Sequence, residues 1–141
     1  MDAIVIYESL TGRTRSAGEA IAALLTQRGV PTTACPITHI DYQALSRAEL
    51  VVVGSWVDGL IFVGQRPGRA GRIAAMPALA GKRAAVYLTY AIDAGHALQK
   101  LSDAVAGRGA DVIGGVTIRR DRLEEGVADF VDGLLEVVTP A

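Results

Sequence analysis

The chain has 141 residues, of which 50% are apolar and 21% are charged, and its formal net charge is −1. This length suits one domain with a sizeable core, so we expect a single domain over residues 1–141. A near-neutral charge argues against nucleic acid or an anionic membrane as the main partner, and no apolar run reaches the about 18 residues of a membrane span. With no signal-peptide pattern and one cysteine, Cys35, we predict a cytoplasmic protein with no disulfide framework and no Cys-rich metal site.

Strand-like and helix-like segments alternate along the chain. Short β-branched or apolar runs predict five strands, at residues 3–7, 32–37, 50–54, 83–88 and 110–116. Apolar residues at helical spacing predict helices at residues 14–28, 42–47, 71–76, 98–105 and 123–138. Pro31 and Pro36 flank or lie in the second strand, which favours a place at the edge of the sheet.

This alternation predicts an α/β fold in which helices cover both faces of a parallel sheet. Parallel neighbours need right-handed helical crossovers, so five strands and five helices make a three-layer sandwich. For a chain of this length we expect the strand order 2-1-3-4-5, with a switch point between the first and third strands. Ligands bind beyond the carboxyl ends of the strands there, so the loops at residues 8–14, 55–70 and 89–95 should converge.

The loop after the first strand has the composition of a phosphate site. Hydroxyl side chains, a glycine and an arginine stand where the first helix begins. A helix N-terminus offers unpaired N–H groups and the positive end of its dipole, which favour an anion. The alternative is a polar loop whose hydroxyl groups only cap the helix.

A resemblance to a known family is carried by this loop. Ser9-x-Thr11-Gly12-x-Thr14 resembles the phosphate loop of flavodoxins, which also directly follows the first strand, and the whole chain has the element order of that family. The resemblance implies a flavodoxin-like fold and an FMN cofactor. The residues that it places around the FMN phosphate are Ser9, Leu10, Thr11, Gly12, Arg13 and Thr14. A dinucleotide fingerprint and a P-loop are both missing after the first strand.

The second expected loop begins Ser55-Trp56-Val57-Asp58-Gly59, and all five residues are candidate cofactor contacts. Trp56, the only tryptophan, is placed to stack on an isoalloxazine ring, or alternatively to pack over the core. The resemblance supports stacking, because many flavodoxins have an aromatic residue followed by Gly-Asp in this loop. Val57 replaces that glycine, and a β-branched residue disfavours positive φ. We therefore predict a poorly stabilised neutral semiquinone, unless Gly59 supplies the peptide flip.

Two further segments are expected to belong to the site or its surroundings. Thr89, Tyr90 and Ala91 begin the third expected loop, which in flavodoxins contacts the isoalloxazine edge. Tyr90 comes earlier than the family's usual stacking tyrosine, so capping of the core stays an alternative. The segment at residues 60–72 combines an apolar tetrad with three arginines, and we expect it to cover the flavin, dock a partner or plug the core.

No residue set for hydrolysis, group transfer or metal binding is visible, so we assign no catalytic residue. We predict an FMN-binding electron-transfer protein, a monomer or weak dimer, whose partners are a reductase and an acceptor protein. Two alternatives stay open: an FMN-dependent reductase of quinones that uses NAD(P)H, and a flavin-free domain for regulation or interaction. Flavodoxins are typically strongly acidic, and this chain lacks that steering field.

Overall fold

Five parallel strands form the centre of the protein, described here from a computed structural model that covers residues 1–8, 12–58, 66–67, 76–91 and 94–138. The strands are β1 (Ala3–Tyr7), β2 (Thr32–Pro36), β3 (Leu50–Asp58), β5 (Arg83–Tyr90) and β6 (Asp111–Arg119). Their order is β2-β1-β3-β5-β6, with β2 at one edge. The predicted order 2-1-3-4-5 and the edge position of the second strand are therefore confirmed. A two-residue strand, β4 (Arg66–Pro67), pairs antiparallel with the end of β3 and was not predicted.

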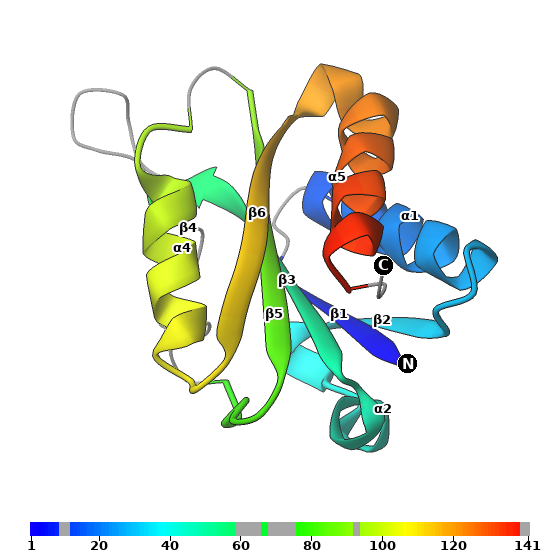
Figure 1. Cartoon of the computed structure of the whole chain (residues 1–141). Helices are drawn as coiled ribbons and strands as arrows, with labels where there is room; N and C mark the ends of the chain where they lie inside the picture. The colour runs from blue at the N-terminus through cyan, green and yellow to red at the C-terminus, as the bar shows by residue number, and fades with distance from the viewer. Residues whose placement is uncertain (9–11, 59–65, 68–75, 92–93, 139–141) are drawn as a thin grey trace.

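Helices cover both faces of this sheet (Figure 1). Helices α1 (Arg13–Gln27) and α5 (Leu123–Val138) pack side by side on one face, while α2 (Tyr42–Arg47) and α4 (Ala97–Ala106) lie on the other. Short 3-10 turns occupy Ile37–His39 and Arg120–Arg122. Except for Met76, which is buried, the helix predicted at residues 71–76 lies outside the described residues.

The core consists of two apolar layers, one on each face of the sheet. Alternate side chains of a strand point to opposite faces, so Ile4 and Ile6 join the layer under α2 and α4, while Val5 joins the layer under α1 and α5. Both layers are almost fully buried. The strands are covered on both sides, which explains why they read as continuous apolar runs in the sequence.

Two central strands are longer than the sequence predicts, and this corrects part of the expected site. β3 continues beyond Gly54 to Asp58, and β5 continues beyond Leu88 to Tyr90. Because Trp56 pairs with Thr89 across these strands, both residues lie in the sheet and not in loops. Ser55 and Tyr90 are likewise strand residues. The apolar runs end early because Gly54 and Thr89 interrupt them, whereas the ladder continues wherever a neighbouring strand supplies partners.

Candidate functional site

The carboxyl ends of β1, β3 and β5 meet at one edge of the sheet, where α1 begins. Gly12 is the N-cap of α1 and adopts φ 91° and ψ −12°, in the left-handed region. A Cβ atom on Gly12 would meet nothing within 4 Å, so the backbone is open to close approach there. In the described part of the chain, no side chain caps this helix and no acidic residue lies in its first turn. The positive end of the α1 dipole is therefore not offset by a carboxylate in that turn.

Thr14, in the first turn of α1, is 1% exposed, and side chains of β5 form hydrogen bonds with it. Its Oγ1 lies 2.8 Å from Oγ1 of Thr89, and either hydroxyl can donate. Its carbonyl oxygen accepts a hydrogen bond of 2.9 Å from the hydroxyl of Tyr87. Thr89 and Tyr87 are both fully buried, so these bonds are shielded from water. The structure thus places Thr14 at the junction of helix and sheet, beneath the helix N-terminus.

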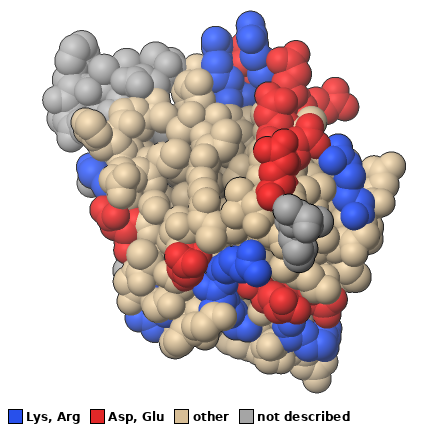
Figure 2. Space-filling view, viewed as in Figure 1, with Lys and Arg blue, Asp and Glu red and all other residues tan. Residues whose placement is uncertain are grey.

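Positive charge gathers beside the start of α1. Arg13 is exposed, and its Nη1 donates to the carbonyl oxygen of Arg120 over 3.3 Å. Arg120 belongs to the turn after β6, and its Nε is buried without a hydrogen-bond partner among the described residues. The same turn contains Arg122, but it also contains Asp121, which accepts from Arg119 over 3.2 Å. Figure 2 shows basic and acidic groups next to each other over this end of the molecule.

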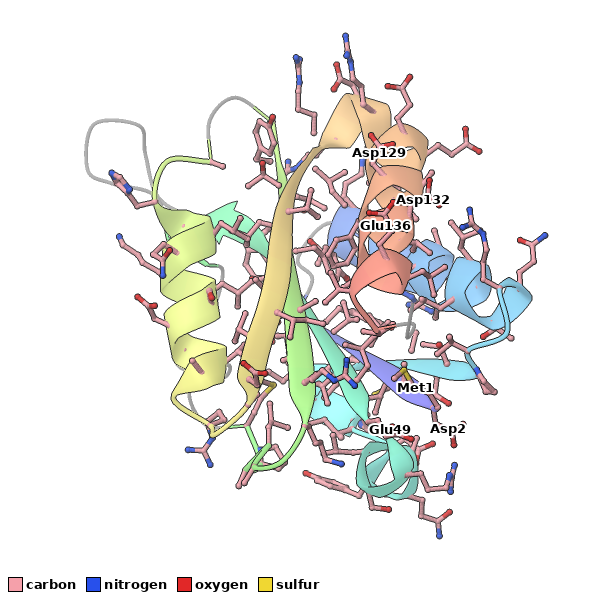
Figure 3. The ribbon with its side chains drawn as sticks, in the orientation of Figure 1. Met1, Asp2, Glu49, Asp129, Asp132 and Glu136 are labelled. Atoms are coloured by element: carbon pink, nitrogen blue, oxygen red, sulfur yellow. The ribbon has the colours of Figure 1, made fainter. Side chains whose placement is uncertain are left out.

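Several other acidic groups lie away from the α1 N-terminus. Figure 3 shows Asp2 and Glu49 at the opposite edge of the sheet, where the strands begin, and Asp129, Asp132 and Glu136 along α5. Asp132 pairs with Arg28 over 2.7 Å. Glu8 lies closer to the α1 N-terminus in sequence, and it is 3% exposed. Its backbone N–H donates to the carbonyl oxygen of Gly54.

The residues predicted to contact the ring of a flavin are less open than expected. Ser55 is fully buried and Trp56 is 8% exposed, both within β3. Stacking needs one free ring face, so the atoms that cover Trp56 must move aside before a flavin can stack on it. Tyr90 is half-buried at the end of β5, and Ala91 beyond it is exposed.

Some predicted site residues lie outside what the structure describes. They are Ser9, Leu10, Thr11 and Gly59, together with most of the segment at residues 60–72. For Val57 and Asp58 only the backbone is described, and it belongs to β3 and pairs with β4. The predicted phosphate-binding residues that are described, Gly12, Arg13 and Thr14, are brought together at the start of α1.

Two hollows of about 310 and 230 Å³ flank β6, one beside α4 and one beside α5. Neither is lined by a residue predicted to bind cofactor. Within the described ranges, no helix is long and apolar enough to cross a membrane. The same residues include no group of three or more His, Cys, Asp or Glu side chains placed to hold a metal ion.

The protein resembles known proteins in its fold but not in its sequence. No protein-family model matches the sequence, and no curated protein matches it. Solved structures do match over nearly the whole chain. A flavodoxin of Streptococcus pneumoniae TIGR4 aligns with a TM-score of 0.73 at 18% identity, over 98% of this chain and 100% of its own. The chain has the flavodoxin fold.

Two further flavodoxin structures agree in extent and in similarity. A short-chain flavodoxin associated with a non-canonical PDU bacterial microcompartment gives a TM-score of 0.73 at 20% identity, and 99% of each chain is covered. Oxidised flavodoxin 1 from Bacillus cereus gives 0.73 at 16% identity, over 99% of this chain and 100% of that one. Both alignments thus extend over nearly the whole of each chain.

Sequence reasoning missed the residues that support the start of α1. The sequence pattern places Tyr87 only within a strand and assigns no role to Gly18 or Gly54. A Cβ on Gly18 would lie 2.6 Å from the Tyr87 hydroxyl oxygen, and one on Gly54 would overlap the Tyr87 ring. A glycine in the middle of a predicted helix is unfavourable, so Gly18 was the available signal for a close contact.

Proposed function

We propose that this protein binds FMN at the carboxyl edge of the sheet and carries electrons between a reductase and an acceptor protein. The observation that carries the proposal is the start of α1, at the switch point of a flavodoxin fold. There no side chain of the described residues caps the helix, and a Cβ on the left-handed Gly12 would meet nothing within 4 Å. Three solved structures with this fold are flavodoxins by name. Bound FMN would supply the redox chemistry.

The residues present suit the phosphate group of FMN. Amide groups of the first turn of α1 would donate to its oxygens, and Gly12 leaves room for the phosphate to approach the backbone. Arg13 adds a positive charge at the same place. Thr14 would hold the turn in place beneath the phosphate, because its side chain and its carbonyl are both bonded to β5.

Binding of the ring of FMN would depend on Trp56 and Tyr90. Tyr90 is half-buried, so part of its ring is already accessible. Trp56 is 8% exposed and would have to be uncovered. This burial favours a second candidate function, a flavin-free domain for interaction or regulation, in which Trp56 serves only the core.

Titration of the purified apoprotein with FMN and riboflavin, followed by flavin fluorescence, tests the proposal. Riboflavin lacks the phosphate, and each hydrogen bond to a charged group is worth about 1.5–3 kcal/mol. We expect FMN to bind about a hundredfold more tightly than riboflavin. Failure to bind either compound would contradict the proposal and favour the flavin-free domain.

Two glycine variants separate the phosphate site from backbone strain. Gly12 and Gly29 stand at the two ends of α1, with φ of 91° and 94°, and neither has an atom within 4 Å of the position of a Cβ. Gly12→Ala and Gly29→Ala should therefore cause similar strain. We expect only Gly12→Ala to reduce the preference for FMN over riboflavin. Equal preference in both variants would show that the phosphate does not bind at Gly12.

A second assay distinguishes a carrier from a reductase. The FMN-loaded protein is mixed with NAD(P)H and a quinone, with and without a flavoprotein reductase. A carrier should accept electrons only when the reductase is present. Oxidation of NAD(P)H without the reductase would identify an enzyme.

A further inference from the structure

Two hydroxyl groups of one strand bond to the first turn of α1. The Tyr87 hydroxyl donates to the Thr14 carbonyl oxygen over 2.9 Å, and Thr89 Oγ1 lies 2.8 Å from Thr14 Oγ1. Both side chains come from β5, two residues apart, so they point to the same face of the sheet. We propose that Tyr87 and Thr89 are positioning residues that fix this turn for the phosphate of FMN, an inference that rests on the proposed function.

The backbone around Tyr87 is shaped to admit its ring. Gly54 is the register partner of Tyr87 on β3, and any side chain there would overlap the ring. Gly18 lies one helical turn after Thr14, where a Cβ would be 2.6 Å from the hydroxyl oxygen. Glycine inside a strand or helix costs about 0.5–1 kcal/mol relative to alanine. The two glycines thus destabilise their own helix and strand slightly, but they leave the space that Tyr87 needs to reach α1.

The hydroxyl of Tyr87 is not needed to satisfy the Thr14 carbonyl. In a regular α-helix that carbonyl already accepts the N–H of Gly18, four residues later. The bond from Tyr87 is therefore an additional one, and it joins the helix to β5. Because it lies in the first turn, it restrains the orientation of the N–H groups that would face a phosphate.

Thr89 has a different effect, because it decides whether the hydroxyl proton of Thr14 is free for another acceptor. When Thr89 donates to Thr14, the Thr14 hydroxyl keeps its own proton for another acceptor. A phosphate above the turn is such an acceptor, and Thr89 would then orient Thr14 toward it. Thr89 is fully buried, so this influence passes through Thr14 and needs no direct contact with FMN.

The main test compares Tyr87→Phe with Tyr7→Phe. Both changes remove a hydroxyl from a buried tyrosine next to α1, since the Tyr7 ring also lies close to Gly18. Of these two hydroxyl groups, that of Tyr87 donates to the backbone of the first turn. We expect Tyr87→Phe to lower the affinity for FMN about three- to tenfold and to leave riboflavin affinity unchanged. Tyr7→Phe should change neither affinity, and a role confined to packing would shift both ligands together.

A second pair of variants tests the Thr89 hydroxyl. Thr89→Val removes the hydroxyl at nearly constant volume, whereas Thr89→Ser keeps it. We expect the preference for FMN to fall about three- to tenfold in Thr89→Val and to be retained in Thr89→Ser. This pair carries the test if Tyr87→Phe does not fold.

The outcomes separate this inference from the proposed function. If wild-type protein prefers FMN but Tyr87→Phe and Thr89→Val retain the full preference, the positioning role is wrong and the FMN site stands. If wild-type protein does not prefer FMN over riboflavin, the FMN site and the positioning role are both wrong. Loss of the preference for FMN in Tyr87→Phe and Thr89→Val, with the preference retained in Tyr7→Phe and Thr89→Ser, supports the FMN site and the positioning role together.

Discussion

The two faces of the sheet differ in what holds their helices. Under α2 and α4 the buried layer is aliphatic apart from Cys35 and Met76, as in Ile4, Val51 and Leu101. Under α1 and α5 the layer includes the Tyr87 and Phe130 rings, 6.3 Å apart, and hydroxyl bonds that reach Thr14. Apolar packing stabilises a helix but is not directional, whereas hydrogen bonds have preferred angles and so fix the orientation of the helix. The directional contacts occur on the face where α1 meets the proposed phosphate site.

The aliphatic face should provide stability without affecting ligand preference. Leu101 is fully buried in α4, and Leu101→Ala should reduce the free energy of unfolding by about 2–5 kcal/mol. Urea unfolding measures this loss, and Leu98→Ala, at a partly buried position of the same helix, should show a smaller one. The preference for FMN over riboflavin should be unchanged in folded Leu101→Ala protein. A change in that preference would contradict the division between the faces.

The opposite face should be sensitive to added volume. Gly54→Ala would press a methyl group into the Tyr87 ring, and we expect a loss of about 1–3 kcal/mol in the free energy of unfolding. Gly114→Ala in β6 is the matched control, because no atom lies within 4 Å of its Cβ position. Equal stability of the two variants in urea would show that the ring can move aside.

Alkaline pH should weaken the same face. Burial raises the pKa of Tyr87 well above its ordinary value of 10.0. As the pH rises past about 10, the unfolded chain loses this proton first, so the free energy of unfolding falls with pH. Burial also raises the pKa of Tyr7 and Cys35, which adds to the fall. Urea unfolding at pH 8 and pH 11 should show a smaller fall for Tyr87→Phe than for the wild type. Identical falls would mean that Tyr87 does not contribute.

The smallest expected change is a gain in stability on α5. Gly133 has no atom within 4 Å of its Cβ position, so Gly133→Ala should raise the free energy of unfolding by about 0.5–1 kcal/mol. Gly126→Ala on the same helix should lower it, because its Cβ would lie 2.7 Å from Ile118 Cγ2. The melting temperatures of the two variants should therefore shift in opposite directions. A shift in the same direction would show that helix propensity outweighs the contact with Ile118.

The sequence by itself determined the architecture. Continuous apolar runs such as Leu50–Val53 are typical of strands that are covered on both faces, and their alternation with helices leaves few topologies. The short helix at Tyr42–Arg47 was predicted at its observed bounds, and α1 was predicted to within one residue. The grouping of Gly12, Arg13 and Thr14 at a helix start was also predicted from local pattern.

Only the tertiary structure decided where β3 and β5 end and what lies beneath α1. Trp56 and Thr89 extend their strands because each finds a partner in the other, and such pairing leaves no local pattern in either segment. The contact of Tyr87 with Thr14 joins residues 73 positions apart, and it exists because Gly18 and Gly54 leave space for one ring. Apolar periodicity records which face of an element is buried, whereas a single hydrogen bond between distant residues depends on how the elements pack.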